Sequence, residues 1–398
     1  MADLTPGKRA ARMLATLAHG GGMEPYPAHW LPEGIRSHFV EGVNGLTMHV
    51  LEAGETGRPA ILLLHGFPEL AFSWRKVMPL LARAGYRVVA PDQRGYGRTT
   101  GADTTYDGDL HSYRRLNLVR DAMGLLAALD LGSVAAVVGH NFGSPVAAWA
   151  AVARPDIFRS VALMSAPFGG TSSWPYPQQE RRDTGRGPGL DSALAALDPP
   201  RRHYQHYYQA REANENMWHP PQGIHAFLRG YYHYKSADWK GNRPYRLDGR
   251  NAEAMSAMPT YYIMERDRGM AETVAEAMPG GDEVATNAWL TEAELAVYAE
   301  EFGRTGFQGG LQWYRAGGQG IAEMEVYAGR HIEQPSLFIA GASDWGAYQS
   351  PGALERMHDH ACTDLRGIHL VEGAGHWVQQ EQPEATAQLL LEFLGAIR

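Results

Sequence analysis

The chain has 398 residues, of which 44% are hydrophobic, enough to fill the core of one large domain with an insertion, or of two domains. Its formal net charge of −8 and pI near 6.1 provide no basic surface for a phosphate backbone, so nucleic acid is not an expected partner. The single cysteine, Cys362, excludes an internal disulfide framework and a cysteine-based zinc site.

The first segment, KRAARMLATLAHGGG over 8–22, is basic with a short apolar part. We interpret it as a lead-in rather than a secretory signal, because no clean cleavage site follows the apolar residues. No apolar stretch approaches the length of about 20 residues that spans a bilayer, so we expect a soluble protein. A single cysteine suits a reducing compartment, which indicates a cytoplasmic location.

Two strands are predicted within HFVEGVNGLTMHVLEAG over 38–54. They flank Asn44 and Gly45, a pair that supplies the positive φ angles of a tight hairpin turn. The next run, AILLLHG over 60–66, is almost entirely apolar and ends in glycine. Such a run is typical of a strand buried on both faces of a parallel sheet.

Helices and strands then alternate up to residue 168, which predicts a mostly parallel, doubly wound α/β sheet. From Phe168 to about Arg330 this alternation is replaced by loops and helix-like segments rich in aromatic residues, so we predict an insertion. Its clearest helix begins at Thr291, which forms a capping box with Glu294. The alternation resumes afterwards. The predicted helices are 73–85, 117–131, 144–155 and 384–397, and the strands lie within 86–92, 134–140, 160–167, 335–346 and 368–377.

The stretch VVGHNFGSP over 137–145 joins a predicted strand to a predicted helix. It has the pattern of the nucleophile elbow in the α/β-hydrolase fold. The turn is so tight that side chains two positions before and after the nucleophile would collide with backbone, which accounts for Gly139 and Gly143. Asn141 occupies the position of the nucleophile.

Partners for this position follow other strands. The backbone N–H groups of Phe67, after the strand at 60–66, and of Phe142 are expected to form an oxyanion hole. Asp344 and His376 each come just after a predicted strand, and open α/β sheets gather catalytic groups at such strand ends. The order elbow, acid, histidine is the order of this fold, which predicts a catalytic triad. His65 is expected to be structural.

The stretches HGFPE, SAPF, GLQWYR and GHWVQQEQP, in this order, resemble those of the soluble epoxide hydrolases within the α/β-hydrolase superfamily. The resemblance covers about residues 38–398 and includes motifs of the insertion. It implies that the insertion is a helical cap and that two cap tyrosines, Tyr314 and Tyr204, donate hydrogen bonds to the epoxide oxygen. Tyr207 and Tyr208 lie close to Tyr204 and leave that assignment less specific.

The same resemblance divides the chain into four parts and adds substrate contacts. Residues 1–37 are the lead-in, 38–168 and 331–398 are the two parts of the α/β-hydrolase core, and 169–330 are the cap. The insertion holds 13 of the 19 tyrosines, which is consistent with phenols facing a substrate. Trp313 and Trp377, within two of the motifs, are expected to bind substrate. The length of the cap favours a bulky or lipophilic epoxide.

In the family an elbow aspartate attacks a ring carbon, and the histidine then activates water to hydrolyse the alkyl-enzyme ester to a vicinal diol. Asn141 lacks the charge of a carboxylate, so this chain is expected to be inactive or very slow. Three explanations remain open: replacement of a natural aspartate, natural divergence to a protein that binds a small molecule, and slow hydrolysis of the amide to aspartate. The last can accompany either of the others.

Other classes fit less well. A serine esterase needs serine at the elbow, and the nearest, Ser144, lies three residues further on. A haloalkane dehalogenase needs side-chain N–H donors where Phe67 and Phe142 stand, and a haloacid dehalogenase needs cationic groups. A non-catalytic receptor remains an alternative. The Gly-rich loop DQRGYGRT over 92–99 is interpreted as a structural turn, and no metal or organic cofactor site is recognised.

Overall fold

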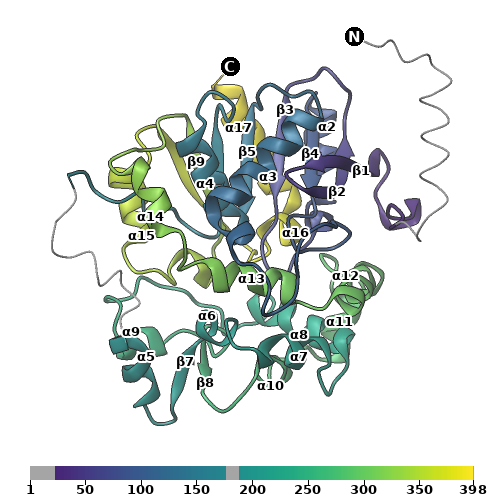
Figure 1. Ribbon diagram of the computed structural model, residues 1–398. Helices are drawn as coiled ribbons and strands as arrows, with labels where there is room; N and C mark the ends of the chain where they lie inside the picture. The colour runs from purple at the N-terminus through teal and green to yellow at the C-terminus, as the bar shows by residue number, and fades with distance from the viewer. Residues whose placement is uncertain (1–22, 176–187, 398) are drawn as a thin grey trace.

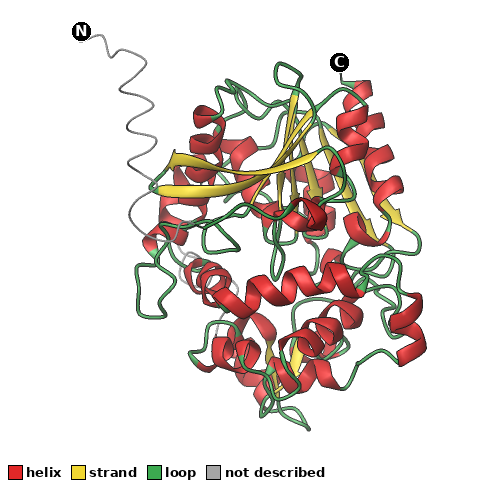
Figure 2. Cartoon of the chain, turned by 90° about the vertical axis from the view of Figure 1, so that its right-hand side faces the viewer, coloured by secondary structure: helices red, strands yellow, loops and turns green. Residues whose placement is uncertain are grey.

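The computed structural model describes residues 23–175 and 188–397, and the basic segment at 8–22 lies outside them. An eight-stranded sheet forms the centre of the molecule, with helices on both sides (Figures 1 and 2). The strand order is β1-β2-β4-β3-β5-β6-β9-β10, in which β1–β2 and β2–β4 are antiparallel and the other pairs parallel. The predicted mostly parallel α/β sheet is confirmed. The strands are β1 (Ile35–Val43), β2 (Leu46–Ala53), β3 (Ala60–Leu64), β4 (Arg87–Pro91), β5 (Ala136–His140), β6 (Val161–Met164), β9 (Ser336–Gly341) and β10 (Leu365–Val371).

The hairpin turn between β1 and β2 is formed as predicted. Asn44 has a φ of +49° and Gly45 a φ of +83°, the positive values that such a two-residue turn requires. The strands β3, β5, β6 and β9 that follow are buried along their whole length, because helices cover both faces of the sheet.

Core helices form two groups, in which α3 packs against α4 and α2 packs against α17. The helix predicted over 73–85 is shorter than expected, because the structure has a 3-10 turn over Ala71–Trp74 and a helix only from Met78. Pro79 lacks an N–H and favours the first turn of a helix, which agrees with a helix that begins at Met78. The core helices are α2 (Met78–Arg83), α3 (Arg115–Ala128), α4 (Gly143–Ala153), α15 (Ala353–Arg356), α16 (Val378–Glu381) and α17 (Pro383–Ala396).

Most of the chain between β6 and β9 forms a mainly helical layer beside the sheet, in the lower half of Figures 1 and 2, whereas its last α-helix, α14, lies beside the core near α15 in Figure 1. It also contains a short antiparallel pair, β7 (Arg201–His203) and β8 (Ile263–Glu265), which was not predicted because three residues give no periodic signal. The helices are α5 (Pro188–Ala195), α6 (Tyr204–Tyr207), α7 (Glu212–Trp218), α8 (Ile224–Lys235), α9 (Ala252–Ser256), α10 (Met270–Ala275), α11 (Gly281–Thr286), α12 (Glu292–Thr305), α13 (Gln308–Ala316) and α14 (Ile321–Met324).

Helix α12 begins with the predicted capping box and is joined to the core by ion pairs of two of its glutamates. Arg75 Nε donates to Glu294 Oε1 at 2.9 Å, and Arg98 Nε donates to Glu301 Oε1 at 2.8 Å. Arg75 is 1% exposed and Glu301 is fully buried. Glu294 also lies 3.4 Å from Lys76, and Glu301 also pairs with Arg304 of its own helix, so both carboxylates attach α12 to the core within small charge networks.

Candidate active site

The turn between β5 and α4 has the geometry of the predicted elbow. Asn141 has a φ of +52°, in the left-handed region that asparagine tolerates better than most residues. A Cβ atom on Gly139 would lie 2.2 Å from the carbonyl oxygen of Gly143, and one on Gly143 would lie 2.3 Å from that of Leu64. Both glycines are therefore required by the close approach of backbone, as the sequence indicated.

The amide of Asn141 is held by contacts on both of its ends. Its Oδ1 accepts hydrogen bonds from the N–H groups of Phe67 at 3.0 Å and Phe142 at 2.7 Å. Its Nδ2 lies 2.9 Å from Nε2 of His376. The oxygen of the amide, and not its nitrogen, must face Phe67 and Phe142, because their two N–H groups are donors and need an acceptor. A Cβ on Gly66 would come within 2.7 Å of the Asn141 side chain, so the loop after β3 can approach that side chain closely only because residue 66 is glycine.

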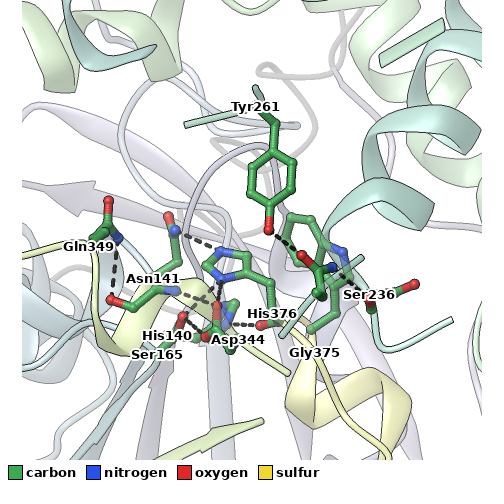
Figure 3. A network of polar contacts seen from close by, with 12 residues as sticks. His140, Asn141, Ser165, Ser236, Tyr261, Asp344, Gln349, Gly375 and His376 are labelled. Carbon is green, nitrogen blue, oxygen red and sulfur yellow. Dashed lines mark hydrogen bonds and ion pairs between the residues drawn. The ribbon is translucent and has the colours of Figure 1, made fainter. Parts of the chain in front are cut away.

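His376 lies between Asn141 and Asp344, and all three side chains are buried (Figure 3). Its Nδ1 is 2.9 Å from Asp344 Oδ1, and its Nε2 accepts from the amide, so the proton belongs on Nδ1. Burial and the nearby charge of Lys235 lower the pKa of His376 to about 4, although Asp344 acts in the opposite direction. The imidazole is therefore a neutral base at physiological pH.

Ser165 is a further member of this group that the sequence did not single out. Its Oγ donates to Asp344 Oδ2 and lies 2.9 Å from His376 Nδ1. Asp344 also accepts from the N–H of Gly346 at 2.7 Å. Burial alone would raise the pKa of Asp344, but His376 and these donors hold it below its usual value. The carboxylate is thus ionised and fixed in orientation.

A second acid and histidine pair lies directly behind the first and was likewise missed. Glu69 Oε2 is 2.6 Å from Nδ1 of His140, and Nε2 of His140 lies 2.7 Å from the backbone oxygen of His376. Burial opposes ionisation of both groups, but each favours the charged form of the other, which lowers the pKa of Glu69 and raises that of His140. Both residues stand in motifs that the sequence analysis quoted, since Glu69 ends the stretch HGFPE and His140 directly precedes Asn141.

The two predicted tyrosines meet above the elbow. The ring of Tyr314, on α13, lies 5.0 Å from the ring of Phe142, and its centroid is 6.1 Å from that of Tyr204. The hydroxyl of Tyr207 binds Asn216 at 2.7 Å and that of Tyr208 binds Tyr231 at 2.8 Å, although the Tyr208 ring also packs 5.0 Å from that of Tyr314. Among these three neighbours, Tyr204 is the one that lines the pocket beside Asn141.

The hydroxyl of Tyr204 is engaged by two glutamines. It donates to Gln349 Oε1 at 3.1 Å, across the boundary between insertion and core, and accepts from Gln205 Nε2 at 3.0 Å. Burial raises the pKa of Tyr314 above its usual value, so this phenol remains a proton donor. A pocket of about 130 Å³ lies between the phenols and the elbow. It is lined by Arg115, Asn141, Phe142, Pro145, Ala166, Tyr204, Gln205, Tyr314, Gly317 and Gln349.

The structure does not place Trp313 or Trp377 on the wall of this pocket. The indole N–H of Trp313 donates to the backbone oxygen of Arg94 at 2.9 Å, and that of Trp377 donates to the backbone oxygen of Tyr232 at 2.8 Å. Both side chains are almost fully buried, because they support Phe142 and His376 from behind. Their expected contact with substrate is replaced by a packing role.

Two residues that the sequence analysis set aside are structural. His65 is fully buried, with Nδ1 2.8 Å from the oxygen of Gly66 and Nε2 accepting from the N–H of Gln93 at 3.0 Å. Ser144 is fully buried and donates to the oxygen of Ala166 at 2.6 Å. Neither side chain is available as a catalytic group in this arrangement.

Residues 23–175 and 188–397 contain neither a metal-ligand cluster nor a helix that could span a membrane. Within these ranges no group of three or more His, Cys, Asp or Glu side chains has the arrangement of a metal site. Among the helices of the same ranges, none has the length and hydrophobicity needed to cross a bilayer.

The parallel sheet, the strained elbow, the two-donor oxyanion hole and the aligned histidine and acid define an α/β hydrolase. The α/β hydrolase fold family matches residues 59–383. Epoxide hydrolase B of Mycobacterium tuberculosis is 34% identical over 374 residues, covering 91% of this chain and 99% of that protein. An epoxide hydrolase of Caballeronia sordidicola is 30% identical, covering 92% and 95%.

Solved structures agree. An epoxide hydrolase from an endophytic Streptomyces has a TM-score of 0.72 at 32% identity, covering 92% of this chain and 97% of that one. Epoxide hydrolase A of Mycobacterium thermoresistibile has a TM-score of 0.69 at 32% identity, covering 92% and 99%. The chain belongs to the soluble epoxide hydrolase family of the α/β-hydrolase superfamily.

Proposed function

We propose that this site opens an epoxide to a vicinal diol through an alkyl-enzyme ester at residue 141, and that Asn141 blocks the first step. The arrangement of residue 141 supports the proposal most strongly. One atom of its side chain sits between the N–H groups of Phe67 and Phe142, and the other faces His376. The position therefore suits a carboxylate whose second oxygen attacks and whose ester is then hydrolysed.

The proposed cycle uses five side chains. With aspartate at 141, Tyr204 and Tyr314 hydrogen-bond the ring oxygen while the carboxylate attacks a ring carbon, so the ring C–O bond breaks and the ring oxygen takes a proton from one of these phenols. His376, oriented by Asp344, then removes a proton from water, which attacks the ester carbonyl, and this proton restores the phenol at the end of the cycle. The N–H groups of Phe67 and Phe142 stabilise the oxyanion that forms, and the diol leaves. We assign residues 169–330 as the cap over this pocket.

Asn141 retains the shape of the aspartate but not its negative charge. Its nitrogen lone pair is delocalised into the carbonyl, and its N–H is directed at His376. Neither end of the amide can attack carbon. We infer that the chain with Asn141 binds its substrate without turnover, as expected of an aspartate-to-asparagine replacement.

Diol formation from a panel of aromatic and aliphatic epoxides tests the proposal, with this chain and Asn141→Asp assayed side by side. Formation of diols by the aspartate form supports an epoxide hydrolase. Saturable binding with no turnover by either form favours the alternative, a diverged member of the fold that binds a small molecule. Release of halide from haloalkanes without diol formation favours a dehalogenase.

The amide at 141 is also placed for its own slow hydrolysis. Its carbonyl oxygen occupies the two-donor site, and His376 is within hydrogen-bonding distance of its nitrogen. We expect incubation of the purified chain to raise its mass by about 1 Da at this position and to produce epoxide turnover after a lag. Peptide mass spectrometry over time measures this, with His376→Gln as the control that stays unchanged. A constant mass together with immediate activity contradicts it.

The two phenols are expected to contribute to ring opening. In the Asn141→Asp background, Tyr314→Phe and Tyr204→Phe should each lower the rate of ester formation by roughly 10²-fold or more, because each removes a donor to the ring oxygen. Tyr207→Phe is the matched control, since its hydroxyl binds Asn216 inside the insertion. Rapid-quench measurement of the ester gives the rates. Equal rates for all three variants contradict the assignment.

A further inference from the structure

Lys235, the last residue of α8, is a buried cation surrounded by aromatic rings. It is 4% exposed, and its Nζ lies 4.9 Å from the ring centroid of Tyr262, 5.6 Å from those of Tyr231 and Tyr261, and 5.7 Å from that of Trp377. Within residues 23–175 and 188–397 this ammonium has no carboxylate within ion-pair distance. Cation–π contacts therefore offset part of the cost of its burial.

The lysine adjoins His376 through both backbone and side chain. The N–H of His376 donates to the backbone oxygen of Lys235 at 2.8 Å. A Cβ on Gly375 would lie 2.6 Å from that oxygen, so the glycine permits this approach; Ser236, Gly375 and His376 lie together in Figure 3. The ring of Trp377 is 4.7 Å from the imidazole and 5.7 Å from Nζ, so the ammonium lies no more than about 10 Å from the imidazole.

The charges around this pair are mainly negative. Asp344 contacts His376 directly, and Glu69 contacts His140 behind it. An aspartate at 141 adds a third buried carboxylate. Burial lowers the pKa of Lys235 to about 8 against the effect of Asp344 and Glu69, so it remains mostly protonated at neutral pH. A further acid, Glu381, accepts from the N–H groups of Ala237, Gly375 and Trp377, and burial raises its pKa to about 8.

We propose that Lys235 is a positioning residue for ester hydrolysis, whose caged ammonium offsets part of the charge of Asp344 and Glu69 and so keeps His376 neutral to lower pH than burial alone would. A base is then ready as soon as the ester forms. Without this cation the imidazole takes up a proton at a higher pH, and a protonated imidazole cannot accept a proton from water. The inference rests on the proposed function and assigns a role within it to a residue outside the triad.

The test measures decay of the alkyl-enzyme ester against pH in the Asn141→Asp background, by single-turnover quench and mass spectrometry. Lys235→Met removes the positive charge, so His376 holds its proton to higher pH. The acid limb should move up by about one pH unit, the shift that a unit charge about 10 Å away produces at an effective dielectric constant of about 20. Lys235→Arg keeps the charge and should leave the limb in place. The acid limb is used because Glu381 titrates in the alkaline range.

Identical acid limbs for the methionine and arginine variants overturn the proposal and leave Lys235 a packing residue. If Lys235→Met does not fold, Lys235→Gln is the second neutral variant. NMR titration of the His376 imidazole in the chain with Asn141 provides a separate readout that needs no turnover. A midpoint at or above 6.5 there overturns the role of Lys235, whereas failure of Asn141→Asp to form an ester counts against the proposed function alone.

Discussion

Replacing Asn141 by aspartate is expected to raise the rate of epoxide opening at least about 10⁴-fold, the scale on which removal of a catalytic nucleophile acts in other hydrolases. The structure gives the physical reason. The side chain is already placed with one atom in the oxyanion hole and the other toward the pocket and His376, so the substitution restores charge without requiring movement. Diol formation at saturating epoxide, followed by chromatography, measures the gain.

The matched control makes the same chemical change elsewhere. Asn251 accepts the N–H of Ala254 as the N-cap of α9, and aspartate caps a helix equally well. Asn251→Asp should therefore fold normally and leave the chain as slow as before. An Asn141→Asp form that folds but gives less than a tenfold gain on every epoxide would count against an alkyl-enzyme mechanism.

Removing the base should divide the reaction into its two halves. In the Asn141→Asp background, His376→Gln is expected to form the ester in one equivalent per enzyme and then stop, with steady turnover lowered by about 10³-fold or more. Attack on the epoxide needs the carboxylate and the phenols, whereas hydrolysis needs a group that removes a proton from water. Mass spectrometry of the intact protein should detect the protein plus one substrate.

The exposed His358 offers a control for this substitution, because its side chain interacts with the neighbouring Asp359 and lies outside the site. His358→Gln should keep full turnover.

Hydrolysis of the ester with His376 intact should depend on pH, because the same histidine must be neutral to accept a proton from water. An ester at 141 is uncharged, as the amide is, so the pKa of about 4 for His376 applies to it, and hydrolysis should slow only as the pH falls toward that value. If His376→Gln gives a burst of diol but no protein carrying a bound substrate, the assignment of His376 to ester hydrolysis alone is contradicted.

The parts of the site that the sequence predicted are those carried by local patterns. The elbow, Phe67 and Asp344 each follow a buried strand and His376 follows the edge strand β10, and parallel strands bring their carboxyl ends to one edge of the sheet. Ser165 could not be found in this way, because its role depends on a positive φ and on contacts with residues about 180 positions or more away.

Residues of the insertion were harder to assign. Three nearby tyrosines were compatible with the sequence, and only the turn of α6 after β7 decides that Tyr204 faces the elbow. Trp313 and Trp377 lie in the expected motifs, but their N–H groups face backbone oxygens rather than the pocket. The motifs show that these two side chains lie near the site, but they do not show in which direction the side chains point.

The ion pairs at α12 constrain how the pocket exchanges its contents. Lifting the whole insertion from the sheet would separate Arg75 from Glu294 and Arg98 from Glu301, so rigid-body opening breaks both contacts at once. Substrate and diol that pass along the opposite wall of the pocket, which contains Gln205 and Gly317, leave these contacts intact. Exchange is therefore expected to proceed on that side, with α12 stationary.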